Sequence, residues 1–460
     1  MQGRQREQIR LARLLLDSWL DIVYNIGIPL VIFYPYYRDY TDSFNVFPTV
    51  LYYADSWYAT TISELRQVFV TSWFDLVSKT TGGVALLYRL YLVEKVLKEA
   101  QGPQSRQEPK ACEQPSRFAT SGIYRLATSV GSRMIKILDL VLLVWGLIVL
   151  CLHIYSTIVG IRGDSAGCLL ETRPWGSSTY SCVVLEVSCN ARDMTGDVTG
   201  MVDALNNVDP LHVRVLIISH CAQLHMPPIV QDYAALLMLK VYNTTIVTWD
   251  AASAFRDTKN PELQVMYFTR VNMGEIPAGL LVLDFPSQVW DIEFCITDLV
   301  TLPLTVVDAW RDILYLVVEG SPLFAEIPEA IRKLPTMTFV YLDMNGIRSI
   351  PDWVFGEREL VVLSLNGNPL DNLPAVVKSL KRLSILSLQR TNIHSMPVDW
   401  ITAEPPPFSA FVTVRAHGTP LCDTFTGKET VIGPFNITCD PLPLLTFPID
   451  DEDKWRAVNV

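Results

Sequence analysis

The chain has 460 residues, half of them hydrophobic, and its formal net charge is −11 at pH 7. This length allows two or more structural units, and a mean hydropathy of +0.25 is high for a soluble protein, so we expect contact with a membrane. The acidic balance, without a segment dense in lysine and arginine, argues against nucleic acid as a partner.

Residues 1–98 form an apolar region that is predicted to be helical. Residues 14–37 are apolar and aromatic but contain two aspartates and two prolines. Residues 68–93 are a second apolar stretch, interrupted by Asp75, Lys79 and Arg89. Each stretch either spans a membrane or forms an amphipathic helix on the membrane surface or against the other stretch.

Residues 99–136 are predicted to be a flexible basic linker. Residues 99–118 are polar, contain three prolines and carry hardly any large apolar side chain. Such a composition cannot bury enough surface to offset the entropy lost on ordering.

Residues 137–158 differ in kind, because they are apolar apart from Asp139 near their start and His153 near their end. About twenty such residues cross a bilayer as a helix, and a helix satisfies its own backbone hydrogen bonds there. The segment is therefore predicted to be a transmembrane helix, with a buried core helix as the alternative.

The charges that flank this segment predict its orientation. Beyond it the near flank offers only Arg162, with Asp164 beside it. Because positive flanks stay in the cytoplasm, the chain after residue 158 is expected outside the cell or in a lumen, whether the chain crosses once or three times. The basic side consists of Lys95, Lys98, Arg106, Lys110, Arg117, Arg125, Arg133 and Lys136.

Residues 334–397 contain a pattern that repeats every 23 residues. In each copy the first, fourth, sixth and eleventh positions are apolar, the ninth is polar, and an apolar residue followed by proline comes next. Apolar residues two apart point to one face of a short strand, and a polar ninth residue can bond backbone groups that the following turn leaves unpaired. The three copies are Met337, Val340, Leu342, Asn345, Ile347; Leu360, Leu363, Leu365, Asn368, Leu370; and Leu383, Leu386, Leu388, Thr391, Ile393.

This pattern resembles the leucine-rich repeat, L-x-x-L-x-L-x-x-N-x-L. The resemblance covers residues 180–420, with looser copies before residue 313 and asparagine at only a few of the ninth positions. It implies an α/β fold class, in which a solenoid carries a parallel sheet on its concave face, here preceded by an α-helical transmembrane region.

The resemblance also implies that the variable strand positions line the concave face and bind a protein ligand or co-receptor. Exposed aromatic side chains beside charges suit protein recognition, although a merely solvated face is the alternative. The residues expected there are Lys240, Tyr242, Tyr267, Thr269, Glu293, Glu319, Tyr341, Asp343, Asn366 and Gln389, with Glu186 and Arg415 towards the two ends.

Residues 421–460 are predicted to form a carboxy-terminal cap and a polar tail, in which Asp450 and Asp451 are solvated. The resemblance to cysteine-bearing caps of cell-surface repeat proteins implies a Cys422–Cys439 disulfide. Near the amino-terminal cap, Cys168, Cys182 and Cys189 allow one pairing with one thiol left over. Asn243 and Asn436 begin N-glycosylation acceptor tripeptides.

No convincing catalytic motif occurs in the sequence, so the protein is expected not to be an enzyme and to need no cofactor. His220, Cys221 and His225 lie close enough in sequence to suggest a metal site. Cys221 falls on the ninth repeat position, however, where the resemblance implies a structural role, and no metal is expected.

Together these features predict a receptor-like glycoprotein of the plasma membrane, with its repeats outside the cell or in a lumen and a role in signalling. The second hypothesis is a membrane-tethered intracellular scaffold or signalling regulator, which predicts reduced cysteines and an unmodified Asn436. An enzyme or transporter built on the apolar amino-terminal segments is disfavoured by the few spans and the missing motifs.

Overall fold

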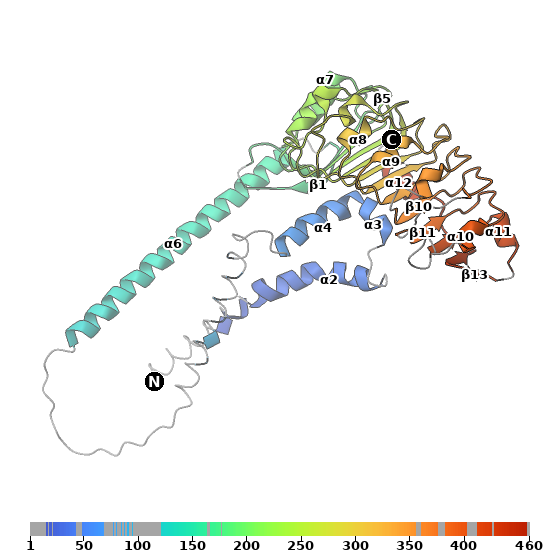
Figure 1. Cartoon of the computed structure of the whole chain (residues 1–460). Coiled ribbons are helices and arrows are strands. Elements are labelled where there is room, and N and C mark those ends of the chain that lie inside the picture. The colour runs from blue at the N-terminus through green and yellow to red at the C-terminus, as the bar shows by residue number, and fades with distance from the viewer. Residues whose placement is uncertain are drawn as a thin grey trace, which may run out of the picture. The chain divides into compact units, whose positions relative to one another are not determined.

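A computed structural model describes residues 15–42 except 17 and 21, residues 48–68, single positions between 77 and 94, residues 121–162, and residues 166–457 except 176, 356–359, 376–381, 403–411 and 426. The chain divides into two compact units, Met1–Leu152 and His153–Val460 (Figure 1).

The first unit is helical where it is described. It contains the π-helical turn η1 (Val23–Gly27), α2 (Ile28–Asp42), α3 (Thr49–Tyr53) and α4 (Asp55–Val68). The Tyr36 hydroxyl of α2 donates a hydrogen bond to Glu64 of α4, and the Tyr36 ring meets Trp57 edge-on at 6.3 Å. The first apolar stretch is thus helical, whereas most of residues 68–93 lie outside the described residues.

The long helix α6 (Ser121–Arg162) contains the predicted transmembrane segment. Among the described residues, only its stretch Leu143–Ile161 is long and apolar enough to cross a membrane by length and composition. The helix starts earlier than predicted: residues 121–136 are helical, so assigning them to a flexible linker was wrong. The linker composition ends near residue 118, and a helix propagates from an established one at little cost. Residues 99–120 lie outside the described part.

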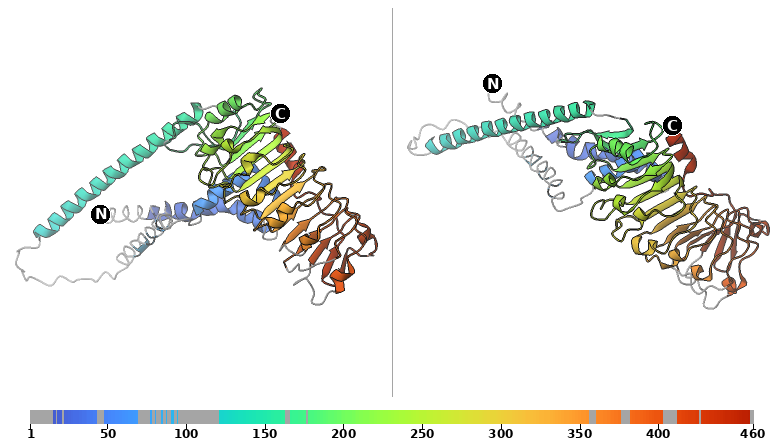
Figure 2. Two further views of the ribbon diagram at one scale, coloured as in Figure 1. Left: turned by 45° about the horizontal axis from the view of Figure 1, so that its top comes forward. Right: turned by 90° about the horizontal axis from the view of Figure 1, so that it is seen from above.

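The second unit is a solenoid built on one long sheet (Figure 2). Its described residues contribute 14 strands to this sheet. Its neighbouring strands are parallel from β2 to β14, and antiparallel strands close the two edges. In spatial order the strands are β1 (Cys168–Thr172), β2 (Ser181–Ser188), β3 (Val215–Ser219), β5 (Met238–Thr248), β6 (Val265–Asn272), β7 (Asp291–Cys295), β8 (Tyr315–Glu319), β9 (Phe339–Tyr341), β10 (Val362–Ser364), β11 (Ile385–Ser387), β12 (Val412–Arg415), β14 (Phe435–Thr438) and β13 (Glu429–Ile432), and β4 (Leu224–His225) pairs with β5.

The return segments of the coils form short helices. Several begin directly after the proline of the apolar-proline pair, which is then the N-cap residue. The N–H of a residue at this end of a helix has no partner within the helix, so its absence in proline costs nothing. They are α7 (Val198–Asn206), η2 (Pro228–Asp232), η3 (Ala251–Ser253), η4 (Ala278–Leu280), α8 (Val306–Ala309), α9 (Glu329–Lys333), η5 (Asp352–Phe355) and α10 (Val398–Thr402), followed by α11 (Pro420–Asp423) and α12 (Ile449–Ala457).

The predicted register of the coils is confirmed. Val340, Leu363 and Leu386 are direct partners in adjacent parallel strands, and Val414 continues the row. These residues belong to one hydrophobic core that runs from Tyr180 to Ile437. The second unit therefore has a mixed α/β fold with a long parallel sheet, consistent with a leucine-rich-repeat solenoid, and the sheet extends beyond the predicted limits of 180–420 to β1 and β14.

The ninth-position asparagines bond the turns as predicted. The Asn368 amide nitrogen donates to the carbonyl oxygens of Leu342 and Leu365 at 2.6 and 3.1 Å, and its oxygen accepts from the backbone N–H of Ile347 at 3.1 Å. Asn345 does the same one coil earlier, with Ser321 and Val318. Each asparagine thus joins neighbouring coils.

Candidate functional site: the inner face of the sheet

The predicted binding residues all lie on the inner face of the sheet, opposite the hydrophobic core. They occupy β5 to β9 or follow β9, β10 and β11, and none of them belongs to the core cluster. Four of them are not solvated, however: Lys240, Glu293, Glu319 and Asp343 are each at most 2% exposed. For these four side chains, neither the exposed binding face nor the merely solvated face expected from the sequence is found.

The chain's own C-terminal segment, defined here as residues 440–457, lies on this face. Its backbone N–H at Leu442 donates to Gln389 Oε1 at 3.0 Å, and the carbonyl of Leu444 accepts from the Asn366 amide at 3.5 Å. The N–H groups of Thr446 and Phe447 donate to the Glu319 carboxylate at 2.9 to 3.2 Å. The segment thus runs backwards along the sheet, from β11 to β8.

Helix α12 continues this path over the first coils through a chain of buried charges. Lys240 Nζ lies 2.8 Å from Glu452, Glu452 accepts from Arg456 Nε at 2.8 Å, and Arg456 Nη1 reaches Glu186 of β2 at 3.2 Å. All four side chains are at most 2% exposed. Two positive and two negative charges balance, which offsets the cost of removing each of them from water.

Asp453 forms a second polar contact between α12 and the sheet. It accepts from the Tyr242 hydroxyl at 2.7 Å and from Arg270 Nε and Nη2 at 2.9 and 2.6 Å. The Arg270 bonds keep the pKa of Asp453 below its usual value. Burial, reinforced by Asp453, raises the pKa of Tyr242 to about 12, so this hydroxyl stays a donor. A bidentate arginine pair of this kind fixes orientation as well as adding energy.

The middle of the inner face carries buried acids on consecutive coils. Burial raises the pKa of Glu319 to about 7 and that of Asp291 to about 7. Burial and the neighbouring Glu319 raise the pKa of Asp343 well above its usual value. Negative charge on Glu319 thus favours the protonated form of the neighbouring Asp343.

This acid cluster predicts a pH-dependent stability. A carboxyl group whose pKa is raised on folding adds stability that is complete below its unfolded value, near 4.5, and is lost as pH rises through about 7. The free energy of unfolding should therefore fall by about 1–3 kcal/mol between pH 5 and 8. Denaturant titrations of the detergent-solubilised chain measure this, and Glu319→Gln should weaken the dependence. Glu326→Gln, at an exposed position, is the control. An unchanged dependence in Glu319→Gln would contradict the assignment.

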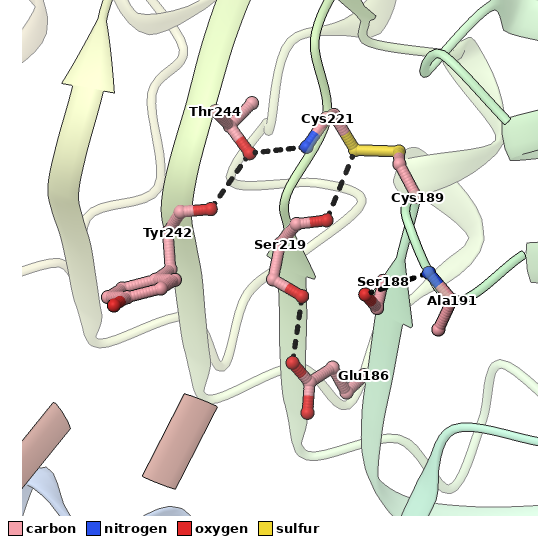
Figure 3. Close-up of a disulfide and its surroundings, with 8 residues drawn as sticks. All are labelled: Glu186, Ser188, Cys189, Ala191, Ser219, Cys221, Tyr242 and Thr244. Carbon is pink, nitrogen blue, oxygen red and sulfur yellow. Dashed lines mark hydrogen bonds between the residues drawn. A yellow bond between two sulfur atoms is a disulfide. The ribbon is translucent and has the colours of Figure 1, made fainter. Parts of the chain in front are cut away.

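Disulfides close both ends of the solenoid. Cys422 and Cys439, which the sequence analysis paired, are bridged, and Cys168 is joined to Cys182. Cys189 is joined to Cys221 of the next coil, so it is not the left-over thiol (Figure 3). Because the Cys221 sulfur is used in this bond, it is not available as a metal ligand.

Around this bridge, hydrogen bonds continue to the inner face. The N–H of Cys221 donates to Thr244 Oγ1 at 3.2 Å, and the Ser219 hydroxyl donates to Glu186 Oε1 at 2.8 Å (Figure 3). Glu186 is thus held by Ser219 on one side and by Arg456 on the other. In the described part of the chain the cysteines outside disulfides are Cys295, which is buried, and Cys151, which is exposed.

The two predicted glycosylation residues lie at different parts of the solenoid. Asn243 is exposed, at the end of the inner face, and its amide contacts His220 Nδ1 at 2.9 Å beside a shallow hollow of about 420 Å³. Asn436 is half-buried in β14, between β12 and β13. Modification of either residue stays a prediction.

Docking of the C-terminal segment was missed by the sequence analysis. Asp450 is exposed, as predicted, but Glu452 and Arg456 are buried in α12, so the tail as a whole is not solvated. The available signal was the i, i+4 spacing of Glu452 and Arg456 behind the apolar residues Leu444 and Phe447. That signal predicts a helix but does not indicate the surface to which it binds.

The solved structures to which this chain is similar share little sequence with it. A leucine-rich-repeat protein of Leptospira interrogans is 17% identical over 49% of this chain and 53% of its own, with a TM-score of 0.35. The leucine-rich-repeat domain of the type III effector XopL is 17% identical over 46% of this chain and 68% of its own, with a TM-score of 0.28. Listeria monocytogenes InlP is 14% identical over 51% of this chain and 62% of its own, with a TM-score of 0.36.

The match thus spans only about half the length of the Leptospira chain. No family model and no curated protein matches the sequence. Similarity at this level does not extend to function.

Proposed function

We propose that this is a receptor-like membrane protein that binds a protein ligand or co-receptor through the inner face of its leucine-rich-repeat solenoid, and that it acts by binding rather than by catalysis. One observation carries the proposal: the inner face already holds a polypeptide segment. Backbone amides, carboxylates and a guanidinium of residues 440–457 bond to side chains from β2 to β11. A surface built in this way suits the recognition of protein.

The anchor in this proposal is α6. Its residues 143–161 have a mean hydropathy of 2.0, only 6% of the window is buried, and large side chains such as Trp145 and Ile161 are exposed. Burial in lipid would remove this apolar surface from water. The basic residues that precede the apolar stretch 143–161 favour an orientation with the solenoid outside the cell or in a lumen.

The disulfides support this side of the membrane. Three bridges use six cysteines of the second unit, and such bonds persist in oxidising compartments. The intracellular scaffold, in contrast, requires these same cysteines to be reduced.

Protease treatment of sealed microsomes tests the proposal. We expect the solenoid to resist a protease added from outside, which is the cytoplasmic side, and to become sensitive after detergent is added. Glycosidase should shift the mobility of the protein, and Asn436→Gln should reduce that shift. Digestion of the solenoid in intact vesicles would replace our proposal with the intracellular scaffold.

A further inference from the structure

The C-terminal segment lies on a solenoid that is already complete without it. Among the described residues, the hydrophobic core ends at Ile437, and no residue of 440–457 belongs to it. The antiparallel strand β13 and the Cys422–Cys439 disulfide close the last coil. The segment thus continues from Cys439 onto the inner face, and its contacts there are ones that a separate molecule could reproduce.

Those contacts depend on a few side chains at fixed spacing. Phe447, 2% exposed, meets the Tyr267 ring edge-on at 6.0 Å. Five and six residues later, Glu452 binds Lys240 and Asp453 binds Arg270. Four residues after Glu452, Arg456 binds Glu186. Along the sequence, the aromatic residue is thus separated by four residues from two adjacent carboxylates, and these are separated by two further residues from the arginine.

The inner face selects each of these groups by its charge. Lys240 and Arg270 offer two cations to adjacent carboxylates, whereas Glu186 accepts a guanidinium. Glu319 accepts two consecutive backbone N–H groups, which an extended chain of any sequence can supply. The charged positions thus determine sequence preference, and Glu319 fixes the path of the backbone.

We propose that the partner of the inner face is a protein segment with this aromatic, double-carboxylate and arginine spacing, and that it binds by replacing the C-terminal segment. The inference rests on the proposed binding function and names the chemistry of the ligand. A tethered segment competes at an effective concentration on the order of millimolar. The full chain therefore binds the partner more weakly than a chain from which the segment has been removed.

Fluorescence anisotropy with labelled peptides tests this. The probes are residues 441–460, a peptide that keeps only Phe447, Glu452, Asp453 and Arg456 among alanine and serine, and a scrambled control. They are added to the detergent-solubilised full chain and to a variant that ends at Asp440. The shortened chain should bind the first two peptides at least tenfold more tightly than the full chain does, and should ignore the scrambled one. Asp453→Asn or Arg456→Met in the peptide should weaken binding at least tenfold.

Several results would overturn the inference. A folded shortened chain that ignores the peptides, or binds the scrambled one equally, would show that the inner face has no such preference. Loss of its cooperative thermal transition would make the segment an integral part of the fold. Full chains that dimerise by exchanging tails, seen by light scattering, would make a second copy the occupant. Membrane topology and glycosylation are measured in separate experiments. A negative result with the peptides is therefore distinct from a result that contradicts the proposed membrane topology.

Discussion

Replacing Arg456 by methionine is expected to release α12 from the inner face. Arg456 is fully buried and bonds two carboxylates, Glu452 and Glu186. Without the guanidinium, the two acids would lose one of the two positive charges of this buried chain, and Lys240 would remain beside Glu452. Removing one member of a buried ion pair costs about 3–5 kcal/mol. Since the segment can leave the sheet and become hydrated, this cost makes the equilibrium constant for its opening about 10²–10⁴ times larger.

Limited chymotrypsin digestion measures this opening at Leu445 and Trp455, because both residues must leave the sheet before they can be cleaved. We expect cleavage of Arg456→Met to be about a hundredfold faster than cleavage of the native chain. Lys454→Met is the matched control on the same helix: this side chain is 73% exposed and forms a surface ion pair with Asp451. It should change the rate little. Equal cleavage of the native chain and Arg456→Met would contradict the buried charge chain.

Asn368→Ala is expected to destabilise the solenoid itself. The side chain is 1% exposed and bonds two carbonyl oxygens and one N–H in adjacent coils. Alanine would leave these backbone groups buried without the partner that satisfies them, at about 1–3 kcal/mol each. We expect the free energy of unfolding to fall by about 3–5 kcal/mol in total, since relaxation of the turn recovers part of the loss.

Chemical denaturation followed by circular dichroism measures that loss. Asn392→Ala is the control in the next coil, because its exposed side-chain amide donates to the surface carboxylate of Asp371 rather than to a buried backbone group among the described residues. This control should stay within about 0.5 kcal/mol of the native chain. Similar losses in the two variants would show that the ninth-position asparagine does not carry the turn.

The fold could be predicted from sequence because a constant period fixes the register. Once residues 23 apart are stacked, Val340, Leu363 and Leu386 must face one core. For the same reason, Asn345 and Asn368 must occupy equivalent turns in successive coils. The inner-face residues could be predicted from the same alternation, since the neighbours of core residues in a strand point to the other side of the sheet. Their position was therefore predictable.

The occupant of that face was not predictable. Leu442 and Gln389 are 53 residues apart, and Arg456 and Glu186 are 270 apart, with no periodic relation to connect them. Charge pairing of this kind depends on the curvature of the finished sheet and on where the last coil ends. The Cys189–Cys221 bridge was missed for a related reason, because Cys221 was explained by its repeat position alone.

Hydrogen–deuterium exchange of the full chain is the most direct test of the central claim, that the inner face of the solenoid is a polypeptide-binding surface occupied by residues 440–457. The N–H groups of Thr446 and Phe447 bond to Glu319, so peptides that contain them should exchange orders of magnitude more slowly than an unstructured peptide. Exchange should become fast in Arg456→Met, while strand β8 stays protected by the sheet. Exchange of these two amides at the unstructured rate in the native chain would show that the inner face is open and would contradict the account.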